Sequence, residues 1–283
     1  MAEDKIHHMK AALYTLLLVS ILLSCKKSTE LHYDHPASVH FNLVPENIDS
    51  IIYTFAYKPS LAQDTIWLPV QISGFRQHQN RSYSAYVDQD SSTAKAGEHF
   101  EPLKDSYTLP SDSGTTKLPV IIYNTSALEN GAVSLVIKLK ATNELGVEIP
   151  TGADGTRLLK SKIVFSATLA KPNWWNMWMG AYYSQTKHQL FLIVTGVTTL
   201  TTEGIDAPRN LYIANLLTTM LNDPFKWVAD NPGKGYILEP VNAGSDESYY
   251  FYNTGNPGKK LLLKKNVSVG GYYFIDENEE EVS

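Results

Sequence analysis

The sequence predicts a mainly β protein, with a β-sandwich over residues 38–170 and a smaller α+β domain over residues 171–283. Three observations indicate this organisation. Seven short segments between residues 39 and 167 alternate apolar and polar side chains with a period of two, the pattern of half-buried strands. Turn residues separate most of these segments, and no helical stretch interrupts them. The pattern changes at Lys171, where a tryptophan-rich stretch begins, so we place the domain boundary there.

The strands of the predicted sandwich are assigned from the alternation. They cover residues 39–43, 51–57, 66–72, 83–87, 118–122, 133–139 and 163–167. Pro69 and Pro119 lie inside two of these segments. Because proline has no N–H for the ladder, we expect each of them on an edge strand or at a bulge.

The C-terminal domain is predicted to contain one clear helix. Asp206 is placed to cap a helix that has Pro208 in its first turn and runs to about Asn222, where an Asp-Pro pair ends it. Three later segments have the composition of strands: 249–252, 260–263 and 272–275. The acidic residues at 276–281 are interpreted as a solvated end.

Composition limits the classes of partner. Of the 283 residues, 43% are hydrophobic and 19% are charged, which are the values of a folded globular protein. The net charge of -5 and the scattered lysines provide no basic surface for a polyanion, so we expect no nucleic-acid partner.

The N-terminal region has the features of an export signal. Residues 11–23 are uncharged and mostly apolar, and as a helix they would cover only about 20 Å, which is short of the hydrocarbon core of a bilayer. Residues 1–24 are therefore interpreted as a cleaved signal peptide. The tetrad that ends in Cys25 is similar to a bacterial lipobox, so we expect Cys25 to be lipidated and residues 25–37 to form a tether. The alternative is an unmodified cysteine that follows a signal.

Residues 86–100 resemble the Calx-beta signature, in which a strand leads into Thr-Ala-x-x-Gly-x-Asp-Tyr. Thr93, Ala94 and Gly97 are kept, while Glu98-His99-Phe100 departs from the usual acidic and aromatic pair. The resemblance implies an immunoglobulin-like, Calx-beta-like sandwich at the N-terminal side of the chain. It also implies a possible Ca²⁺ site, for which Asp88 and Asp90 are the candidate ligands, with Asp112 as a possible third. The alternative is ordinary Asp/Ser turn chemistry, and we expect no other cofactor.

A longer resemblance combines this stretch, the lipobox and two C-terminal motifs, residues 171–175 and Gly180-Ala181-Tyr182-Tyr183-Ser184-x-x-Lys187. Together they are similar to an uncharacterised Bacteroidota lipoprotein family that carries a domain of unknown function. The resemblance implies a lipid-anchored protein of the outer membrane, exposed at the cell surface. It also implies an accompanying starch-utilisation-type importer, a TonB-dependent barrel capped by a substrate-binding lipoprotein lid.

Aromatic side chains are the candidate binding residues. Trp174, Trp175 and Trp178 are candidates for a platform that stacks on a sugar ring or peptide, and the alternative is that they anchor the joint between the domains. Adjacent strand residues point to opposite faces, so one ring of each C-terminal tyrosine pair should be buried and the other exposed. The interface candidates among the tyrosines are Tyr182, Tyr183, Tyr250 and Tyr273.

The sequence contains no Gly-x-Ser-x-Gly elbow, P-loop, dinucleotide fingerprint or His-Glu-x-x-His motif. We therefore predict a non-catalytic accessory protein that binds a peptide or glycan ligand, docks to the importer subunits, or does both. The alternative is an extracellular hydrolase that acts on glycans or peptides. Neither the ligand nor the side of the membrane follows from the sequence.

Overall fold

The computed structural model describes residues 36–148, 158–268 and 270–283. Cys25, the predicted signal peptide and the tether up to His35 lie outside the described residues. The described chain is mainly β, with several sheets and few helices, as the sequence predicts. Residues 36–283 form one compact unit that holds two hydrophobic cores.

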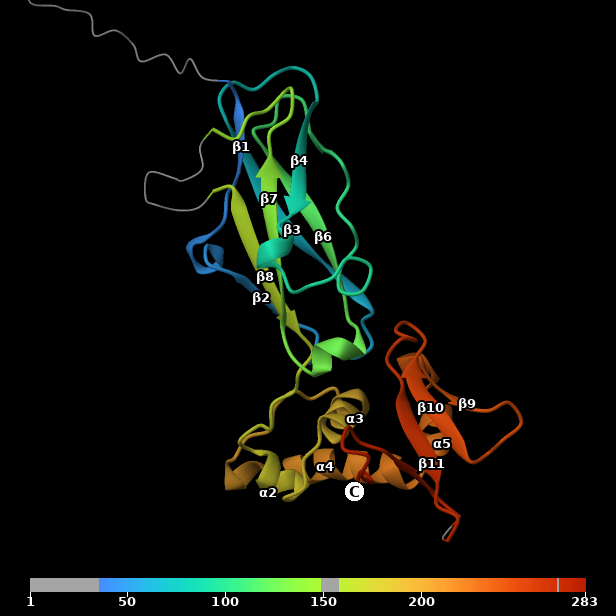
Figure 1. Cartoon of the computed structure of the whole chain (residues 1–283). Helices are drawn as coiled ribbons and strands as arrows, with labels where there is room; N and C mark the ends of the chain where they lie inside the picture. Colours follow the sequence, from blue (N-terminus) through green and yellow to red (C-terminus); the bar gives the residue numbers. More distant parts are fainter. Residues whose placement is uncertain (1–35, 149–157, 269) are drawn as a thin grey trace, which may run out of the picture. The chain divides into compact units, whose positions relative to one another are not determined.

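Two sheets form a sandwich around the first core (Figure 1). The larger sheet has the order β2-β8-β7-β4-β5, and the smaller one has the order β1-β3-β6. Their strands are β1 (Ser38–Phe41), β2 (Ile51–Thr54), β3 (Gln63–Ser73), β4 (Arg81–Val87), β5 (Tyr107–Leu109), β6 (Thr115–Tyr123), β7 (Val133–Lys140) and β8 (Lys160–Ser166). All pairings are antiparallel except β2 with β8, which is parallel.

The alternating apolar and polar residues of the sequence lie on opposite faces of each strand. Leu118, Val120 and Ile122 of β6 are fully buried, and the residues between them face outward. Each of the seven predicted segments contains a strand of the structure, so this part of the prediction is confirmed. The short strand β5 was not predicted, because it is only three residues long and pairs only with the start of β4.

The two prolines have different positions. Pro119 lies on β6 at the edge of the smaller sheet, as predicted. The prediction for Pro69 was wrong, because it lies in β3, the central strand. The last residue of β1, Phe41, pairs with Val70, and the Pro69 carbonyl accepts from Asn42 N–H just beyond the end of β1. The missing N–H of Pro69 points to the same side, so it costs the ladder nothing there.

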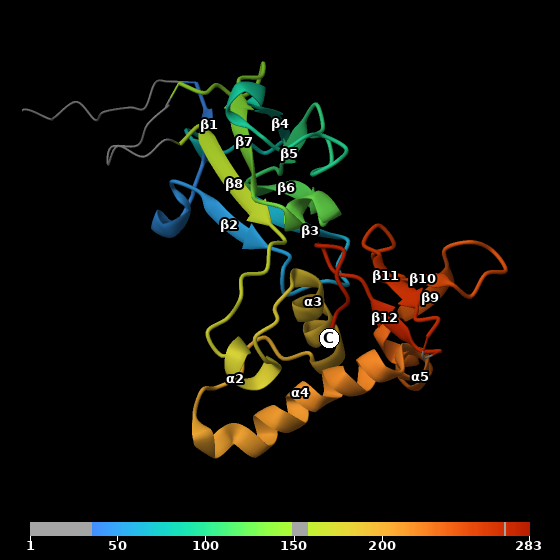
Figure 2. The same ribbon diagram turned by 60° about the horizontal axis from the view of Figure 1, so that its bottom comes forward.

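The second core lies between helices and a four-stranded antiparallel sheet (Figure 2). The helices are α2 (Trp175–Met179), α3 (Gln185–Thr195), α4 (Ala207–Asn222) and α5 (Pro224–Asp230). The sheet has the order β12-β11-β10-β9, and its strands are β9 (Tyr236–Pro240), β10 (Ser248–Asn253), β11 (Leu261–Lys265) and β12 (Tyr272–Phe274).

Helix α4 is the helix that the sequence predicts, with Pro208 in its first turn. The expected capping role of Asp206 was wrong: its side chain makes no capping hydrogen bond and instead accepts from Thr201 Oγ at 2.6 Å. Asp223 ends α4 and also begins α5, where its Oδ1 accepts from Lys226 N–H at 2.9 Å. Helices α2, α3 and α5 and strand β9 were not predicted.

The tyrosine pairs of the C-terminal sheet point to opposite faces as predicted, but all four residues are half-buried, so the predicted contrast between a buried and an exposed ring is wrong. Tyr249 and Tyr272 pack against the second core, and their rings lie 4.9 Å from the ring of Phe225. Tyr250 and Tyr273 belong to the opposite face of the sheet. One face therefore closes the core and the other faces away from it.

Candidate functional site

Trp174 and Trp175 are core residues. Both are buried, and Trp175 is 0% exposed. The indole Nε1 of Trp175 donates to the carbonyl oxygen of Tyr182 at 2.8 Å, and its ring packs against Tyr183 and His188. Neither tryptophan presents a flat face to solvent, and both pack inside the second core.

Tyr183 and His188 complete this buried aromatic cluster. Tyr183 Oη donates to the carbonyl oxygen of Leu169 at 2.9 Å, and burial raises the pKa of Tyr183 to about 12. Burial lowers the pKa of His188 to about 4, and its Nε2 is buried without a hydrogen-bond partner among the described residues. The imidazole is therefore neutral at physiological pH. Tyr183 is thus a structural residue rather than an exposed contact residue.

The other two aromatic candidates of this segment, Trp178 and Tyr182, border an open pocket between α2, the turn after it and α4. The pocket has a volume of about 360 Å³. Its lining consists of Trp178, Met179, Gly180, Ala181, Tyr182, Lys187, Ala214, Leu217, Thr218, Leu221 and Ser283. We call it the Lys187 pocket. The sequence motif 180–187 thus supplies both an aromatic wall and a lysine.

The aromatic walls of the Lys187 pocket are held by hydrogen bonds. Trp178 Nε1 donates to the carbonyl oxygen of Thr201 at 2.7 Å. Tyr182 Oη donates to Asp276 Oδ2 at 2.6 Å, and the pKa of Tyr182 is raised to about 12, first by burial and then by this hydrogen bond. Both rings therefore have one fixed orientation before any ligand arrives.

Lys187 has the one charged side chain among the residues that line the pocket, and 6% of its surface is exposed. Its Nζ donates to the carbonyl oxygen of Met179 at 3.1 Å and lies 5.3 Å from the ring centroid of Tyr182. Burial lowers the pKa of Lys187. Within the described ranges no carboxylate oxygen lies within 4 Å of this ammonium group. The sequence motif 180–187 contained this lysine, but sequence patterns could not show its burial.

The acidic segment at 276–281 corrects one sequence prediction, because two of its carboxylates are structural. Asp276 is buried and accepts from Tyr182 Oη and from the backbone N–H of Asn278 and Glu280. Glu277 accepts from the N–H groups of Gln185 and Thr186 at 2.6 and 3.1 Å, at the start of α3. A carboxylate at this end complements the helix dipole, so this segment fixes α3 rather than extending into solvent.

A second candidate site is the side of the C-terminal sheet that faces away from the core. We call it the outer sheet face. It carries Ile237, Glu239, Tyr250, Tyr252, Lys260, Leu262, Lys264 and Tyr273. The ammonium of Lys260 lies 4.8 and 4.7 Å from the ring centroids of Tyr250 and Tyr252. Glu239 pairs with Lys260 at 3.1 Å and accepts from Tyr252 Oη at 3.0 Å.

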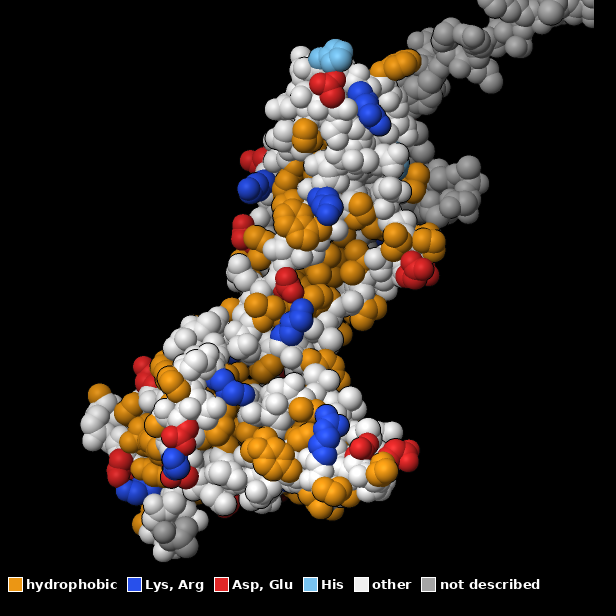
Figure 3. Space-filling model, turned by 180° about the vertical axis from the view of Figure 1, so that it is seen from behind, with side chains coloured by type: hydrophobic (Ala, Val, Ile, Leu, Met, Phe, Trp, Pro, Cys, Tyr) orange, Lys and Arg blue, Asp and Glu red, His pale blue; other side chains and the backbone are white. Residues whose placement is uncertain are grey.

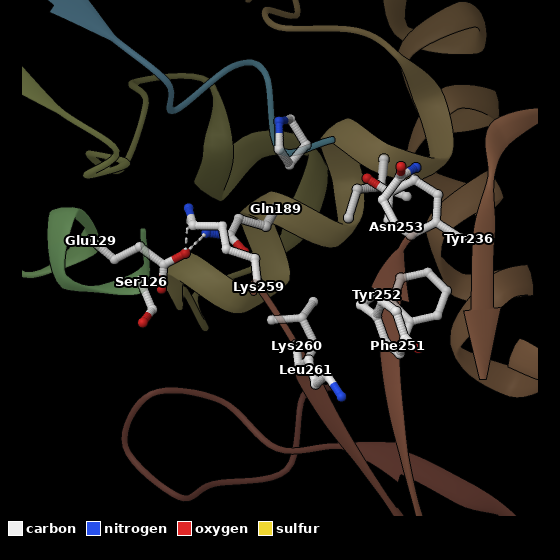
Figure 4. Close-up of a pocket in the computed structure, with 12 residues that line it drawn as sticks. Ser126, Glu129, Gln189, Tyr236, Phe251, Tyr252, Asn253, Lys259, Lys260 and Leu261 are labelled. Atoms are coloured by element: carbon white, nitrogen blue, oxygen red, sulfur yellow. Dashed lines mark hydrogen bonds and ion pairs between the residues drawn. The ribbon is translucent and has the colours of Figure 1, made fainter. Parts of the chain in front are cut away.

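A third, smaller pocket lies where the loop after β6 meets α3 and the C-terminal sheet (Figure 4). Glu129 Oε1 accepts from Lys259 Nζ and from Gln189 Nε2, both at 2.7 Å. Nearby, Asn256 Nδ2 donates to the carbonyl oxygens of Pro59 and Leu61, both at 3.3 Å. With a volume of only about 50 Å³, this pocket has room for water but not for a sugar ring, so we interpret it as a joint.

The chain was compared with known proteins. A family model described as "Domain of unknown function (DUF4843)" matches residues 33–197. The chain belongs to this family. No curated protein matches. This family match covers the sandwich together with α2, α3 and Lys187, and the outer sheet face lies beyond it.

Two solved structures show weak similarity. The crystal structure of CBD12 from CALX1.2 is 14% identical, with a TM-score of 0.32, over 46% of this chain and 43% of that chain. A protein of unknown function from Bacteroides ovatus is 12% identical, with a TM-score of 0.36, over 81% of this chain and 65% of that chain. The chain thus spans less than two thirds of the length of either structure.

The calcium candidates lie in the turn after β4. Asp88 pairs with Lys138 at 2.7 Å and accepts from Ser91 Oγ at 2.9 Å, and these contacts, Lys138 first, lower the pKa of Asp88. Asp90 is exposed. The described part of the chain has no group of three or more His, Cys, Asp or Glu side chains arranged to hold a metal ion. The local contacts favour the turn alternative, and calcium binding stays a prediction.

The described surface has further features outside these sites. Trp67 on β3 is 56% exposed, and sequence alternation alone did not single it out because an outward strand position is expected to be polar. On the face drawn in Figure 3, basic side chains are scattered among acidic and hydrophobic ones and form no continuous stripe. Within the described residues, no helix has both the length and the apolar character needed to cross a membrane.

Proposed function

We propose that this protein is a non-catalytic lipoprotein of the outer-membrane surface that docks, through its outer sheet face, to a TonB-dependent nutrient importer. The observation that carries the proposal is the set of half-buried tyrosines on this face, Tyr250, Tyr252 and Tyr273, which lie on the side of the sheet opposite the second core. Lipidation of Cys25 would hold the protein at the membrane.

The chemistry of the outer sheet face is suited to a protein partner. Tyrosine combines a large apolar ring with a polar tip, and it is enriched at the centres of interfaces. Here Lys260 lies against two of the rings and Glu239 holds both Lys260 and Tyr252. These contacts order the side chains in advance, which lowers the entropy that binding must overcome.

Affinity purification from native membranes in mild detergent tests the docking. We expect the wild-type chain to recover the importer barrel and its substrate-binding lid. Tyr250→Ala and Tyr273→Ala should each weaken recovery, at a cost of about 1–2 kcal/mol of association for each ring. Tyr86→Ala is the matched control, because Tyr86 is an exposed strand tyrosine of the sandwich.

Two outcomes would contradict the docking proposal. Loss of recovery in Tyr86→Ala to the same degree would show that any exposed tyrosine has this effect. Failure of the wild type to recover either importer subunit, together with cleavage of a glycan or peptide by the purified protein, would replace docking by the hydrolase alternative.

The anchor is tested separately by membrane fractionation. Cys25→Ala removes the sulfur that would carry the lipid. We expect the wild type in the membrane fraction and the variant in the soluble fraction, with mass spectrometry of the mature N-terminus identifying the acyl chains. A variant that stays membrane-bound would show that the lipid is not the anchor.

A further inference from the structure

We propose that the Lys187 pocket binds a small ligand that carries a carboxylate on an apolar body. This site is independent of the outer sheet face. The pocket lies between α2, the turn after it and α4, and it joins one buried ammonium group to aromatic and aliphatic walls.

The first step is the charge of Lys187. Buried charges in proteins are normally paired, because leaving water without a counter-charge is costly. An ammonium has three N–H donors, and among the described residues only Met179 O accepts from Lys187 Nζ. The burial of Lys187 lowers its pKa with no opposing contribution from a neighbouring charge. A ligand carboxylate would supply both the missing acceptors and the missing counter-charge.

The second step is the shape and chemistry of the walls. A volume of about 360 Å³ is within the range of small-molecule pockets, roughly 300–1,000 Å³. Trp178, Leu217 and Leu221 provide an apolar surface beside the lysine. Since the rings of Trp178 and Tyr182 are already held by hydrogen bonds, the site loses little freedom when a ligand binds.

The third step is a comparison with other lysines of the same region. Lys259 is nearly as buried, but it is paired with Glu129. Lys234 Nζ donates to two carbonyl oxygens at the end of α3, those of Ile193 and Val194. Lys187 therefore differs from both in having neither a carboxylate nor a second carbonyl among the described residues.

A purely structural role for Lys187 is the competing explanation, because its ammonium lies at the C-terminal end of α2, where a cation is favourable. Lys171 provides a matched control for this role. Its Nζ donates to the carbonyl oxygen of Ala181 at 3.1 Å, in the same turn, but Lys171 does not line the pocket. If the two lysines only hold the turn, both the Lys187 and the Lys171 variants should lose ligand affinity. If Lys187 contacts the ligand, only its variant should lose affinity.

The experiment titrates the full-length protein in mild detergent with 4-phenylbutyrate and with its neutral amide, 4-phenylbutanamide, followed by calorimetry and by tryptophan fluorescence, with detergent alone as the blank. We expect saturable binding of the carboxylate and affinity for the amide that is lower by about tenfold, because a charge-assisted hydrogen bond is lost. Lys187→Met should abolish saturable binding, and Lys171→Met should bind as the wild type does.

If circular dichroism shows that Lys187→Met does not fold, a second variant still tests the proposal. Thr218 is exposed on α4 and lines the pocket, so Thr218→Trp fills the pocket while Lys187 and the buried core residues keep their identity. It should also abolish binding. Equal affinity for the carboxylate and the amide, equal losses in the Lys171 and Lys187 variants, or no saturable binding of 4-phenylbutyrate would each overturn the proposal.

Discussion

The sandwich and the C-terminal region bury different kinds of side chain. The sandwich core is mostly aliphatic and aromatic, although Arg81, His99 and Asn124 are also buried there, and its strands place an apolar side inward and the other side outward. The C-terminal core also encloses Lys187, His188 and Asp276. Helix α3 is buried from Thr186 to Val194 without a break. Buried polar residues are thus more numerous in the C-terminal region, and four of them, Thr186 to Gln189, lie in α3, whose residues are buried all round.

The largest expected effect comes from removing one buried ring from each core. It tests whether the two cores unfold separately. Trp175→Ala in the C-terminal core and Phe165→Ala in the sandwich each remove a fully buried ring, and each should lower the free energy of unfolding by about 3–5 kcal/mol. Hydrogen exchange followed by mass spectrometry locates the effect. We expect faster exchange in α3 and β10 for Trp175→Ala, and in β7 and β8 for Phe165→Ala.

The same measurement can break the comparison. If both variants accelerate exchange in both regions to the same degree, residues 36–283 unfold as one cooperative body. The predicted division into separate domains, 38–170 and 171–283, would then be wrong.

The next effect is a pH dependence that belongs to the C-terminal core. Burial lowers the pKa of His188 from 6.5 to about 4. Between these values the unfolded chain binds a proton that the folded chain does not, so the free energy of unfolding falls as the pH drops from 6.5 towards 4. The loss from this residue should approach about 3 kcal/mol. Urea denaturation at a series of pH values measures it.

His188→Phe should flatten this part of the curve, because the aromatic cluster keeps a ring but loses the titrating group. His78→Gln is the control, since the side chain of His78 is 98% exposed. An unchanged slope in His188→Phe would mean that another group causes the acid sensitivity. His40 in the sandwich, whose pKa is also lowered by burial, would be the first to test.

A smaller effect is expected at the joint in Figure 4. Glu129→Gln removes the counter-charge of Lys259, whose side chain is only 10% exposed, and should lower the free energy of unfolding by about 1–3 kcal/mol. Glu239→Gln breaks a comparable pair with the more exposed Lys260 and should cost less than about 1 kcal/mol. Equal costs for the two variants, measured by urea denaturation, would show that the joint pair gains nothing from its burial.

The smallest effect concerns the acidic end. Glu277→Gln weakens the contact with the first N–H groups of α3 and should cost about 1 kcal/mol. The exposed Glu281 provides the control, because Glu281→Gln alters only a surface charge. Thermal melting should distinguish the two variants. Equal melting temperatures for Glu277→Gln and Glu281→Gln would show that Glu277 is a solvated residue, as the sequence indicates.

The elements that sequence patterns located share one property: they have a solvent-facing side. For this reason the sequence alone could reveal the alternation in β6 and in the tyrosine pairs of β10 and β12. Helix α4 was found because Ile213, Leu217 and Met220 form one buried stripe on an otherwise exposed helix. Helix α3 has no such stripe, because both its polar and its apolar residues are buried. Periodicity therefore could not reveal it.

By itself, the sequence determined most of the strands and their order, though not β5 or β9, the change from sandwich to C-terminal region, and which tyrosines share a face, since these depend on local backbone periods. Only the tertiary structure decided that Trp175 is core, that Asp276 holds Tyr182 across 94 positions of sequence, and that Lys187 lies buried beside a pocket. Burial and hydrogen bonding between distant residues depend on how the elements pack, and no local pattern encodes that packing.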